Sequence, residues 1–253
     1  MKAYYISDLH LPHFVSLKEN KVRNYVLNSL IAEDAKTSLM IVAGDVSEYI
    51  GQIHATLDEL SKHYKYVIFV FGNHDLYLPT KNQKKQYHWS SSNKILALKE
   101  KLKGTTNVFI LDNEVIELDG NVIAGTKLWY SIPENDLFAY KKNITDAEMI
   151  FEPVIDTMPW EIYHKEDLAF YNKLSEVDLL ISHVPPIHPK KSPYNYDPAF
   201  TTTVDFLKAP FWVCGHQHVE VDSVIAGTEF LMNPLGYPFE STFKNFKLKS
   251  FNL

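Results

Sequence analysis

The stretch from residue 66 to residue 75 constrains the fold more than any other part of the chain. Residues 66–71 are all β-branched or aromatic, and they end at Gly72, after which come Asn73, His74 and Asp75. An apolar run of this length, closed by a turn residue, predicts a strand that is buried on both faces. Because open α/β sheets bind ligands beyond the carboxyl ends of their strands, the three polar residues mark a candidate site.

The chain repeats this pattern, an apolar strand followed by carboxylate, amide or imidazole groups, five times in all. Strands are predicted over residues 2–7, 39–44, 66–71, 177–182 and 211–215. If they belong to one sheet, their polar ends meet at one edge and offer enough ligands for two metal ions. The residues at these ends are Asp8 and His10, Asp45, Asn73 to Asp75, His183, and His216 and His218.

The spacing within these motifs fits metal binding. Asp8 and His10 lie two residues apart, so in an extended segment both side chains project to the same side, and the same holds for His216 and His218. Asp45 can bridge two ions because a carboxylate has two oxygens. Two metal ions roughly 3.5–4 Å apart would clamp a phosphoryl group and activate a water molecule for in-line attack.

The order of the predicted elements indicates an α/β fold. Helices predicted over residues 17–36 and 51–64 alternate with the first three strands, which is typical of a parallel sheet with right-handed crossovers. Two further helices are predicted, one through residues 95–102 and one over residues 165–174. After Asn107, short strands indicate an antiparallel or mixed portion rich in hairpins. These strands are predicted over residues 108–111, 115–118, 122–124, 219–225, 227–232 and 246–251.

One domain over residues 1–253 is the simplest organisation, since no linker, low-complexity tract or internal repeat interrupts the chain. The least regular part, about residues 127–163, is rich in aromatic residues and carries three prolines. A segment of this length and composition is predicted to be an insertion or lid that borders the site and selects substrate. The alternative is that its aromatic rings pack against the edge of the sheets.

Composition narrows the class of partner. The net charge is −6, and Arg23 is the only arginine. Because phosphate and base recognition favour the bidentate guanidinium group, a dedicated nucleic-acid surface is not expected, although a nuclease that binds one strand through lysines stays open. Cys214 is the only cysteine, which excludes an intramolecular disulfide. No apolar stretch approaches the ~20 residues of a membrane span, and no signal-peptide pattern is present, so we expect a cytoplasmic protein.

Taken in order, the motifs resemble those of the calcineurin-like metallophosphoesterases. Each motif alone is weak, but together they are specific and span most of the chain. The resemblance implies a two-sheet sandwich of mixed strands flanked by helices, in αββα layers, and a metal-dependent phosphoric ester hydrolase. The matching motifs are Asp-x-His at residues 8–10, Gly-Asp at 44–45, Gly-Asn-His-Asp at 72–75, His183, and Gly-His-x-His at 215–218.

The resemblance also implies a role for each strand-end residue. His74 would face the substrate and stabilise or protonate the leaving oxygen. Asp75, which we predict to be catalytic with it, and Glu48 are both candidates to orient His74, and turn capping is an equal alternative for either. Two divalent or trivalent ions are implied, with manganese favoured over iron, zinc, nickel or magnesium. One ion would be bound by Asp8, His10 and His218, and the other by Asn73, His183 and His216, with Asp45 bridging both.

Two further segments, residues 125–129 and 233–238, resemble parts of the small bacterial and phage phosphoesterases of this superfamily. The motif at residues 44–48 reads Gly-Asp-Val-Ser-Glu and lacks the Asp-Arg continuation of the protein serine/threonine phosphatases. A phosphoprotein phosphatase of that branch is therefore disfavoured.

We predict hydrolysis of a small phosphomonoester or phosphodiester by attack of a metal-bound hydroxide. The alternatives are a metal-dependent nuclease acting on DNA and an inactive metal-binding module of the same fold. His13 and His188 are further candidates for contact with substrate, and a surface location is the alternative for each. The sequence predicts no oligomeric state.

Overall fold

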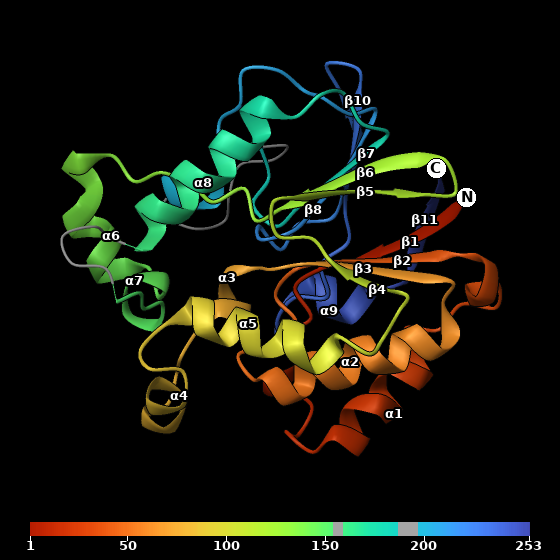
Figure 1. The fold of residues 1–253 in the computed structure, drawn as a ribbon, viewed down its shortest axis with the longest axis horizontal. Helices are drawn as coiled ribbons and strands as arrows, with labels where there is room; N and C mark the ends of the chain where they lie inside the picture. The colour runs from red at the N-terminus through yellow and green to blue at the C-terminus, as the bar shows by residue number, and fades with distance from the viewer. Residues whose placement is uncertain (154–158, 187–196) are drawn as a thin grey trace.

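The structure, a computed structural model, describes residues 1–153, 159–186 and 197–253, and in it the chain forms two sheets that pack face to face (Figure 1). The first sheet has the order β11-β1-β2-β3-β4 and the second the order β5-β6-β7-β8-β10-β9. The strands of the first are β1 (Lys2–Ile6), β2 (Leu39–Ala43), β3 (Tyr66–Val70), β4 (Val108–Ile110) and β11 (Lys249–Asn252). Those of the second are β5 (Glu114–Leu118), β6 (Asn121–Thr126), β7 (Leu179–Ser182), β8 (Phe211–Cys214), β9 (Val221–Ile225) and β10 (Thr228–Met232).

Both sheets are mixed: the edge strands β11, β5 and β9 are antiparallel to their neighbours, whereas the edge strand β4 and the inner strands pair parallel. The pairs β1–β2, β2–β3 and β3–β4 are parallel, as are β6–β7, β7–β8 and β8–β10. Strands β11, β5 and β9 pair antiparallel with β1, β6 and β10. The predicted α/β sandwich of mixed strands is therefore confirmed.

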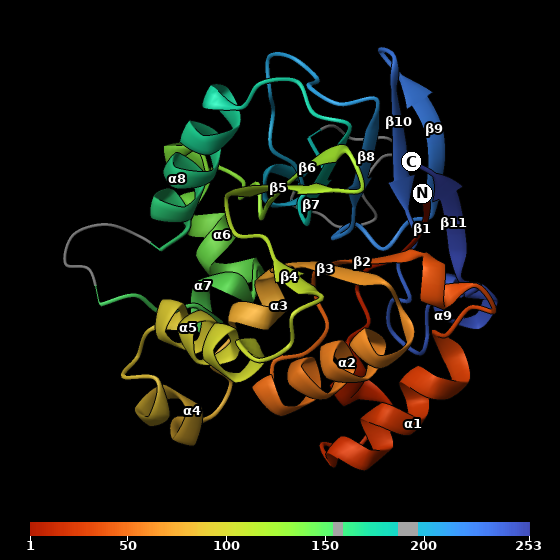
Figure 2. The same cartoon turned by 45° about the vertical axis from the view of Figure 1, so that its right-hand side comes forward.

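Helices cover the outer face of each sheet. The first sheet packs against α1 (Glu19–Ser29), α2 (Ile50–His63) and α5 (Ser91–Leu102), and the second against α8 (Pro159–Lys173), whose Tyr171 stacks on Trp212 of β8. Shorter helices are α3 (Asn73–Leu76), α4 (Lys81–Gln86), α6 (Leu137–Asn143), α7 (Asp146–Met149) and α9 (Ser241–Asn245), with 3₁₀ turns at Leu11–His13, Ala35–Thr37, Glu134–Asp136 and Asp197–Phe200. Figure 2 shows α6 and α7 beside α3 at one end of the sandwich.

The core between the sheets is made by the alternate residues of each strand that face inward. Ile41 and Ile68 of the first sheet lie in one buried cluster with Leu179, Ile181 and Val213 of the second. The intervening residues of β1 to β3 face the helices on the other side, so these strands are buried on both faces, as their unbroken apolar runs predict. Within the described part of the chain, no helix has the length and apolar character needed to cross a membrane.

Three sequence predictions about the fold are wrong. The five strands with polar ends do not share one sheet, since β7 and β8 belong to the second. The strand predicted over residues 108–111 is β4, which extends the parallel part of the first sheet. The strand predicted over residues 246–251 is β11, which forms no hairpin but pairs with β1 from the other end of the chain. Strand pairing depends on which edge is free in three dimensions, which short apolar runs do not encode.

Two helix boundaries also differ from the predictions. Helix α1 ends at Ser29, not near residue 36, because the Tyr64 hydroxyl donates to the Leu30 carbonyl and accepts from the Ala32 N–H at the helix end. Helix α8 begins at Pro159, six residues before the predicted start. Proline is favoured at the first helical position, where its missing N–H has no partner to lose.

Candidate metal centre

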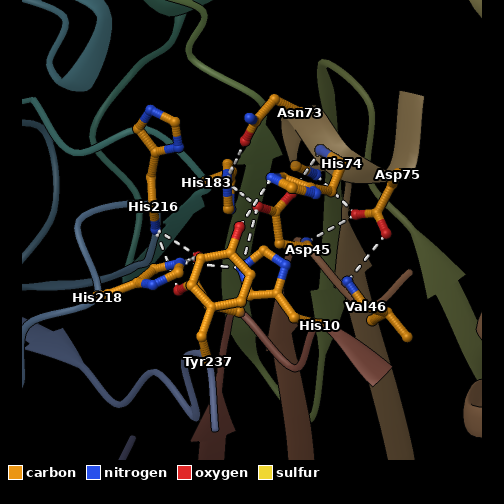
Figure 3. A network of polar contacts seen from close by, with 12 residues as sticks. His10, Asp45, Val46, Asn73, His74, Asp75, His183, His216, His218 and Tyr237 are labelled. Atoms are coloured by element: carbon orange, nitrogen blue, oxygen red, sulfur yellow. Dashed lines mark hydrogen bonds and ion pairs between the residues drawn. The ribbon is translucent and has the colours of Figure 1, made fainter. Parts of the chain in front are cut away.

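The five strand ends meet at one end of the sandwich, where the ends of β1, β2 and β3 face those of β7 and β8. Figure 3 shows the side chains from the two sheets pointing toward one another. All of the predicted ligands lie together there, and six are buried: Asp8, His10, Asp45, Asn73, His183 and His216, with His218 only partly exposed. The structure thus brings together the complete set, from two sheets instead of one.

One group of ligand atoms comes from Asp8, His10 and His218. The Nε2 atoms of His10 and His218 lie 2.9 Å apart, and His218 Nε2 lies 3.5 Å from Asp8 Oδ1. Ligands about 2.1 Å from a common ion are separated from each other by roughly 3.0–3.4 Å, in octahedral or tetrahedral geometry. The spacing of these three atoms fits one metal ion.

A second group comes from Asp45, His183 and His216. His183 Nε2 lies 3.4 Å from Asp45 Oδ2 and 3.1 Å from Asn73 Oδ1. The same Asp45 oxygen lies 3.7 Å from His10 Nε2, which belongs to the first group. Asp45 therefore stands between the two groups, where a bridging carboxylate would lie.

The second ring nitrogens of three histidines have the partners that metal-binding imidazoles have. His183 Nδ1 lies 2.8 Å from the Ala43 carbonyl oxygen, and His216 Nε2 lies 2.9 Å from that of Ala199. His218 Nδ1 lies 2.9 Å from Glu240 Oε2. Such partners fix the tautomer and the ring orientation of a ligand histidine. The donor set and its supports both fit a pair of metal ions.

The electrostatics around Asp8 and Asp45 favour positive charge on His183 and His218, whereas burial lowers the pKa of His10 and lowers that of His216 to about 4. Burial alone would raise the pKa of the Asp8 carboxyl, but the hydrogen bond and charge of His218 outweigh burial and lower this pKa to about 2. Burial would lower the pKa of His183, whereas the charge of Asp45 raises it to about 9. Against burial again, Asp8 and Glu240 raise the pKa of His218 to about 10. The buried carboxylates thus favour positive charge on the neighbouring imidazoles. Bound metal cations would supply this positive charge in place of the protons.

The backbone at the strand ends is strained where the ligands lie. Five of the seven predicted ligands have positive φ angles: Asp8 (52°), His10 (42°), Asp45 (57°), His216 (71°) and His218 (48°). Left-handed backbone at a residue other than glycine costs on the order of 1–3 kcal/mol and gathers at functional sites. The backbone conformation that directs these side chains inward therefore lowers the stability of the folded state.

Gly72 allows two strand ends to approach closely, as its place after the central strand predicts. A Cβ atom there would lie 2.1 Å from Asp45 Oδ1 and 2.6 Å from Asp45 N. Gly44, with φ at +87°, is equally constrained, since a Cβ atom would lie 2.4 Å from His183 Nδ1. Both glycines keep the candidate bridging residue in place.

His74 belongs to neither of the two ligand groups; it forms a third cluster with His10 and Glu48, and Glu48 contacts its ring. His74 Nδ1 lies 2.7 Å from Glu48 Oε1, and its Nε2 lies 3.4 Å from the hydroxyl oxygen of Tyr237. Burial would lower the pKa of His74, but the charges of Asp45 and Glu48 raise it above its ordinary value. Of the two residues that the sequence left open as partners of His74, Glu48 is the one that contacts the imidazole.

Asp75, the other residue predicted to be catalytic, contacts the backbone of two loops. Its two carboxylate oxygens accept four backbone N–H groups, from Asp45 (2.8 Å), Val46 (2.9 Å), Ser47 (3.1 Å) and Gly72 (2.9 Å). Figure 3 shows one carboxylate oxygen at the Val46 N–H, and Asp75 is not among the residues that line the cavity. Asp75 thus ties the loop after β2 to the loop after β3, the capping role that the sequence gave as its alternative.

A cavity of about 560 Å³ opens over the strand ends. This volume suits a small molecule. One side is formed by strand-end residues, and the other by the segment after β6 and by Phe200. The lining residues are Asp45, Asn73, His74, Tyr77, Ala139, Asn143, Ile144, Thr145, Asp146, Ala199, Phe200, His216, His218 and Tyr237.

The aromatic rings of residues 127–163 mostly form core, not cavity wall. Trp129, Tyr130, Tyr140, Trp160 and Tyr163 are buried, as the packing alternative required. The residues of this segment that line the cavity run from α6 to the start of α7, and none is aromatic: Ala139, Asn143, Ile144, Thr145 and Asp146. The segment therefore borders the site, but through other residues than its aromatic ones.

Three residues near the site escaped the sequence predictions. Asp146 contacts the Asn73 amide, Tyr237 stacks on His10 with ring centroids 4.5 Å apart, and Glu240 contacts His218. None follows a strand end directly, so the repeated strand pattern does not mark them. His13 lies against the Tyr237 ring at 4.8 Å, and His188 falls outside the described residues.

A two-sheet sandwich with paired carboxylate and imidazole clusters at its strand ends defines a metal-dependent phosphoesterase class. The sequence profile of the calcineurin-like phosphoesterases matches residues 1–220, and the chain belongs to that family. It is accordingly a phosphoric ester hydrolase that uses divalent metal ions.

Two relatives extend this comparison. Uncharacterized protein L509 of Acanthamoeba polyphaga mimivirus is 24% identical over 261 aligned positions, which cover 93% of this chain and 91% of the viral protein. The crystal structure of phosphopantetheinyl hydrolase from Mycobacterium tuberculosis superposes with a TM-score of 0.78 at 21% identity, over 99% of this chain and 95% of that one. The similarity to the mycobacterial enzyme establishes the shared fold.

Proposed function

We propose that this chain hydrolyses a small phosphodiester whose organic group occupies the cavity between the strand ends and helices α6 and α7. The observation that carries the proposal is the composition of the cavity wall. Its described residues include aromatic and aliphatic side chains and four groups from the metal centre, but neither lysine nor arginine.

Charge favours a diester over a monoester. A phosphomonoester carries about −1.5 to −2 charges at neutral pH, whereas a diester carries one. Beyond the metal ligands, the cation-forming side chain of the described cavity wall is His74, which already contacts Glu48, and the wall also includes the carboxylate Asp146. Arg23, the single arginine, is paired with Asp58 and Glu59 between α1 and α2.

The chain's own residues divide the work of the reaction. Asp8, His10 and His218 would hold one ion and Asn73, His183 and His216 the other, with Asp45 between them. When bound, two such ions polarise the phosphoryl group and lower the pKa of water. His74, held through Nδ1 by Glu48, presents Nε2 to the cavity, where it donates a proton to the leaving oxygen.

The identity of the metal and the location of the protein belong to the proposal as well. Nitrogen and oxygen ligands without a thiolate suit manganese, which we favour, and also iron, zinc, nickel and magnesium. A cytoplasmic location, a small phosphate ester as substrate and the lack of a dedicated nucleic-acid surface stay predictions.

The test is hydrolysis by metal-stripped protein after addition of Mn²⁺, Ni²⁺, Zn²⁺ or Mg²⁺. We expect bis-p-nitrophenyl phosphate to be cleaved with at least about tenfold higher kcat/KM than p-nitrophenyl phosphate, an energy difference of about 1.4 kcal/mol. The substrate panel also includes cyclic nucleotides and a single-stranded oligonucleotide. It further includes a phosphopantetheine ester, which the name of the mycobacterial neighbour suggests. A preference for the monoester or for the oligonucleotide would overturn the proposal, and no turnover with any metal would mark an inactive binding module.

A further inference from the structure

The amide group of Asn73 is held from behind by the segment that follows β6. Asn73 Nδ2 donates to Asp146 Oδ1 at 2.8 Å and to the Tyr77 hydroxyl oxygen at 3.1 Å. On the opposite side, Asn73 Oδ1 lies 3.1 Å from His183 Nε2. The oxygen therefore faces the candidate metal centre, and the nitrogen faces Asp146.

Chemistry leaves this amide only one favourable orientation. An amide has a donor end and an acceptor end, whereas an ionised carboxylate only accepts. Asp146 also accepts hydrogen bonds from the hydroxyls of Tyr77 and Tyr130, and the Tyr130 hydroxyl lies 3.0 Å from that of Tyr140. The Asp146 carboxylate thus accepts from Asn73, Tyr77 and Tyr130. If the Asn73 amide were flipped, its oxygen would face the Asp146 oxygen in a buried site, and its NH₂ group would face the metal ion.

The position of Asp146 in the fold ties this contact to the cavity. Asp146 is the first residue of α7 and is only 2% exposed, yet it also lines the cavity beside Thr145. Helix α7 is fastened to the segment after α3, since the Leu78 N–H donates to the Met149 carbonyl at 2.8 Å. The helix that walls the cavity is thus the helix that reaches the candidate ligand.

We propose that Asp146 is a positioning residue, which turns the Asn73 side-chain oxygen toward the metal ion. The segment of residues 127–163 then belongs to the metal centre and is not only a cover over the substrate. The inference rests on the proposed role of Asn73 as a ligand, and it is independent of which phosphate ester is cleaved.

The test measures Mn²⁺ binding to metal-stripped protein by isothermal titration calorimetry, together with the electron paramagnetic resonance spectrum of the loaded protein. We expect Asp146→Ala to weaken the weaker of two Mn²⁺ sites about 10–100-fold, the usual effect of removing a group that orients a ligand. The coupled two-ion spectrum should be lost at Mn²⁺ concentrations that load both sites of the unaltered protein.

Asp146→Asn provides a rescue. The new amide oxygen still accepts from Asn73 and Tyr77, while its nitrogen donates to the Tyr130 hydroxyl, which turns its own proton toward Tyr140. Binding within about threefold of the unaltered protein supports an orienting role. A loss as large as that of Asp146→Ala would show that negative charge acts instead, and would overturn the proposal.

Asp167→Ala is the matched control. Asp167 is also fully buried and accepts from the Trp129 N–H at 2.9 Å and from Asn113 Nδ2 at 2.8 Å, but it contacts none of the predicted ligands. This variant should lower the melting temperature and leave Mn²⁺ binding unchanged. An equal loss of Mn²⁺ in both variants would reduce the Asp146 effect to general destabilisation, which contradicts the proposal.

Asn73→Ala separates this inference from the ligand assignment. If it leaves both Mn²⁺ sites intact, the assignment of Asn73 fails, and the role of Asp146 fails with it. If it weakens one site while Asp146→Ala does not, only the role of Asp146 is overturned. Should Asp146→Ala not fold, Asp146→Leu decides, because it keeps most of the side-chain volume and removes both acceptor oxygens: weaker Mn²⁺ binding supports the proposal, and unchanged binding contradicts it.

Discussion

The two sides of the cavity are built in different ways. On one side, each functional group stands at the end of a strand, held by strained backbone and by short loops. On the other side, helices α6 and α7 and Phe200 supply the wall, and they come from parts of the chain without strands. The first side is fixed by sheet geometry, and the second by the way that a long connection folds back over the site.

This difference teaches which parts of a site have a local signature. Parallel strands end at one edge, so a polar residue directly after an apolar run is placed by the sheet itself. A group such as Asp146 acquires its role only through contacts 73 residues away in the chain, with Asn73. If this division holds, the strand-end residues perform the chemistry, while the helical side selects the substrate and positions the Asn73 side chain.

The largest effect is expected for Asp45→Asn, on the strand-end side. Losing the bridging negative charge leaves two cations poorly screened from each other, so at least one ion should be lost. Since two-metal catalysis supplies several kcal/mol, activity should fall about 10⁴-fold. Elemental analysis checks the metal content, and full occupancy at both sites would refute the bridging role.

A smaller loss, on the order of 10³-fold in kcat, is expected for His74→Ala, within the range of general acid catalysis. Metal content should stay intact because His74 belongs neither to the group of Asp8, His10 and His218 nor to the group of Asp45, His183 and His216. The loss should shrink for esters of nitrophenol, which leave without a proton. A variant that loses metal along with activity would make His74 a ligand.

Glu48→Gln and Asp75→Asn separate orientation from folding. Glu48→Gln should lower kcat about 10–100-fold with little change in melting temperature, since it weakens only the contact to His74. Asp75→Asn sets an NH₂ group against buried backbone N–H donors, so unfolding should become easier by at least about 2 kcal/mol. Chemical denaturation and kcat measured on both variants check this, and the reverse pattern would restore Asp75 as the orienting residue.

The smallest effect concerns the helical side of the cavity. Ile144→Ala enlarges the wall, so KM for a diester that fills the cavity should rise about threefold to tenfold, as expected when a few methylene contacts are lost. Phe138→Ala is the control, because Phe138 neighbours the lining residue Ala139 but is 80% exposed. If Phe138→Ala changes KM and Ile144→Ala does not, the exposed ring contacts the substrate and the wall is assigned wrongly.

The sequence predicted which residues meet at the strand ends, and through the family resemblance it predicted the class of fold. The strand-end residues from Asp8 to His218 were found because each follows an apolar run. The division of those strands between two sheets was not visible in the runs themselves, since an apolar strand reads the same in either sheet. Only the family resemblance indicated a sandwich.

The errors have a common physical cause in long-range contacts. Helix α1 stops early because Tyr64 caps it from 34 residues away. Asp75 follows His74 in the chain but serves the loop after β2, whereas Glu48, 26 residues away, holds the imidazole. The local sequence pattern predicts which residue types gather at a strand end. Tertiary packing determines which of these side chains contact each other.

The central claim is that seven strand-end residues bind two metal ions bridged by Asp45. Anomalous diffraction from a crystal of the Mn²⁺-loaded protein tests it most directly. We predict two manganese peaks roughly 3.5–4 Å apart, one beside Asp8, His10 and His218 and the other beside Asn73, His183 and His216, with an Asp45 oxygen at both. A single peak, or peaks away from these side chains, would contradict the account.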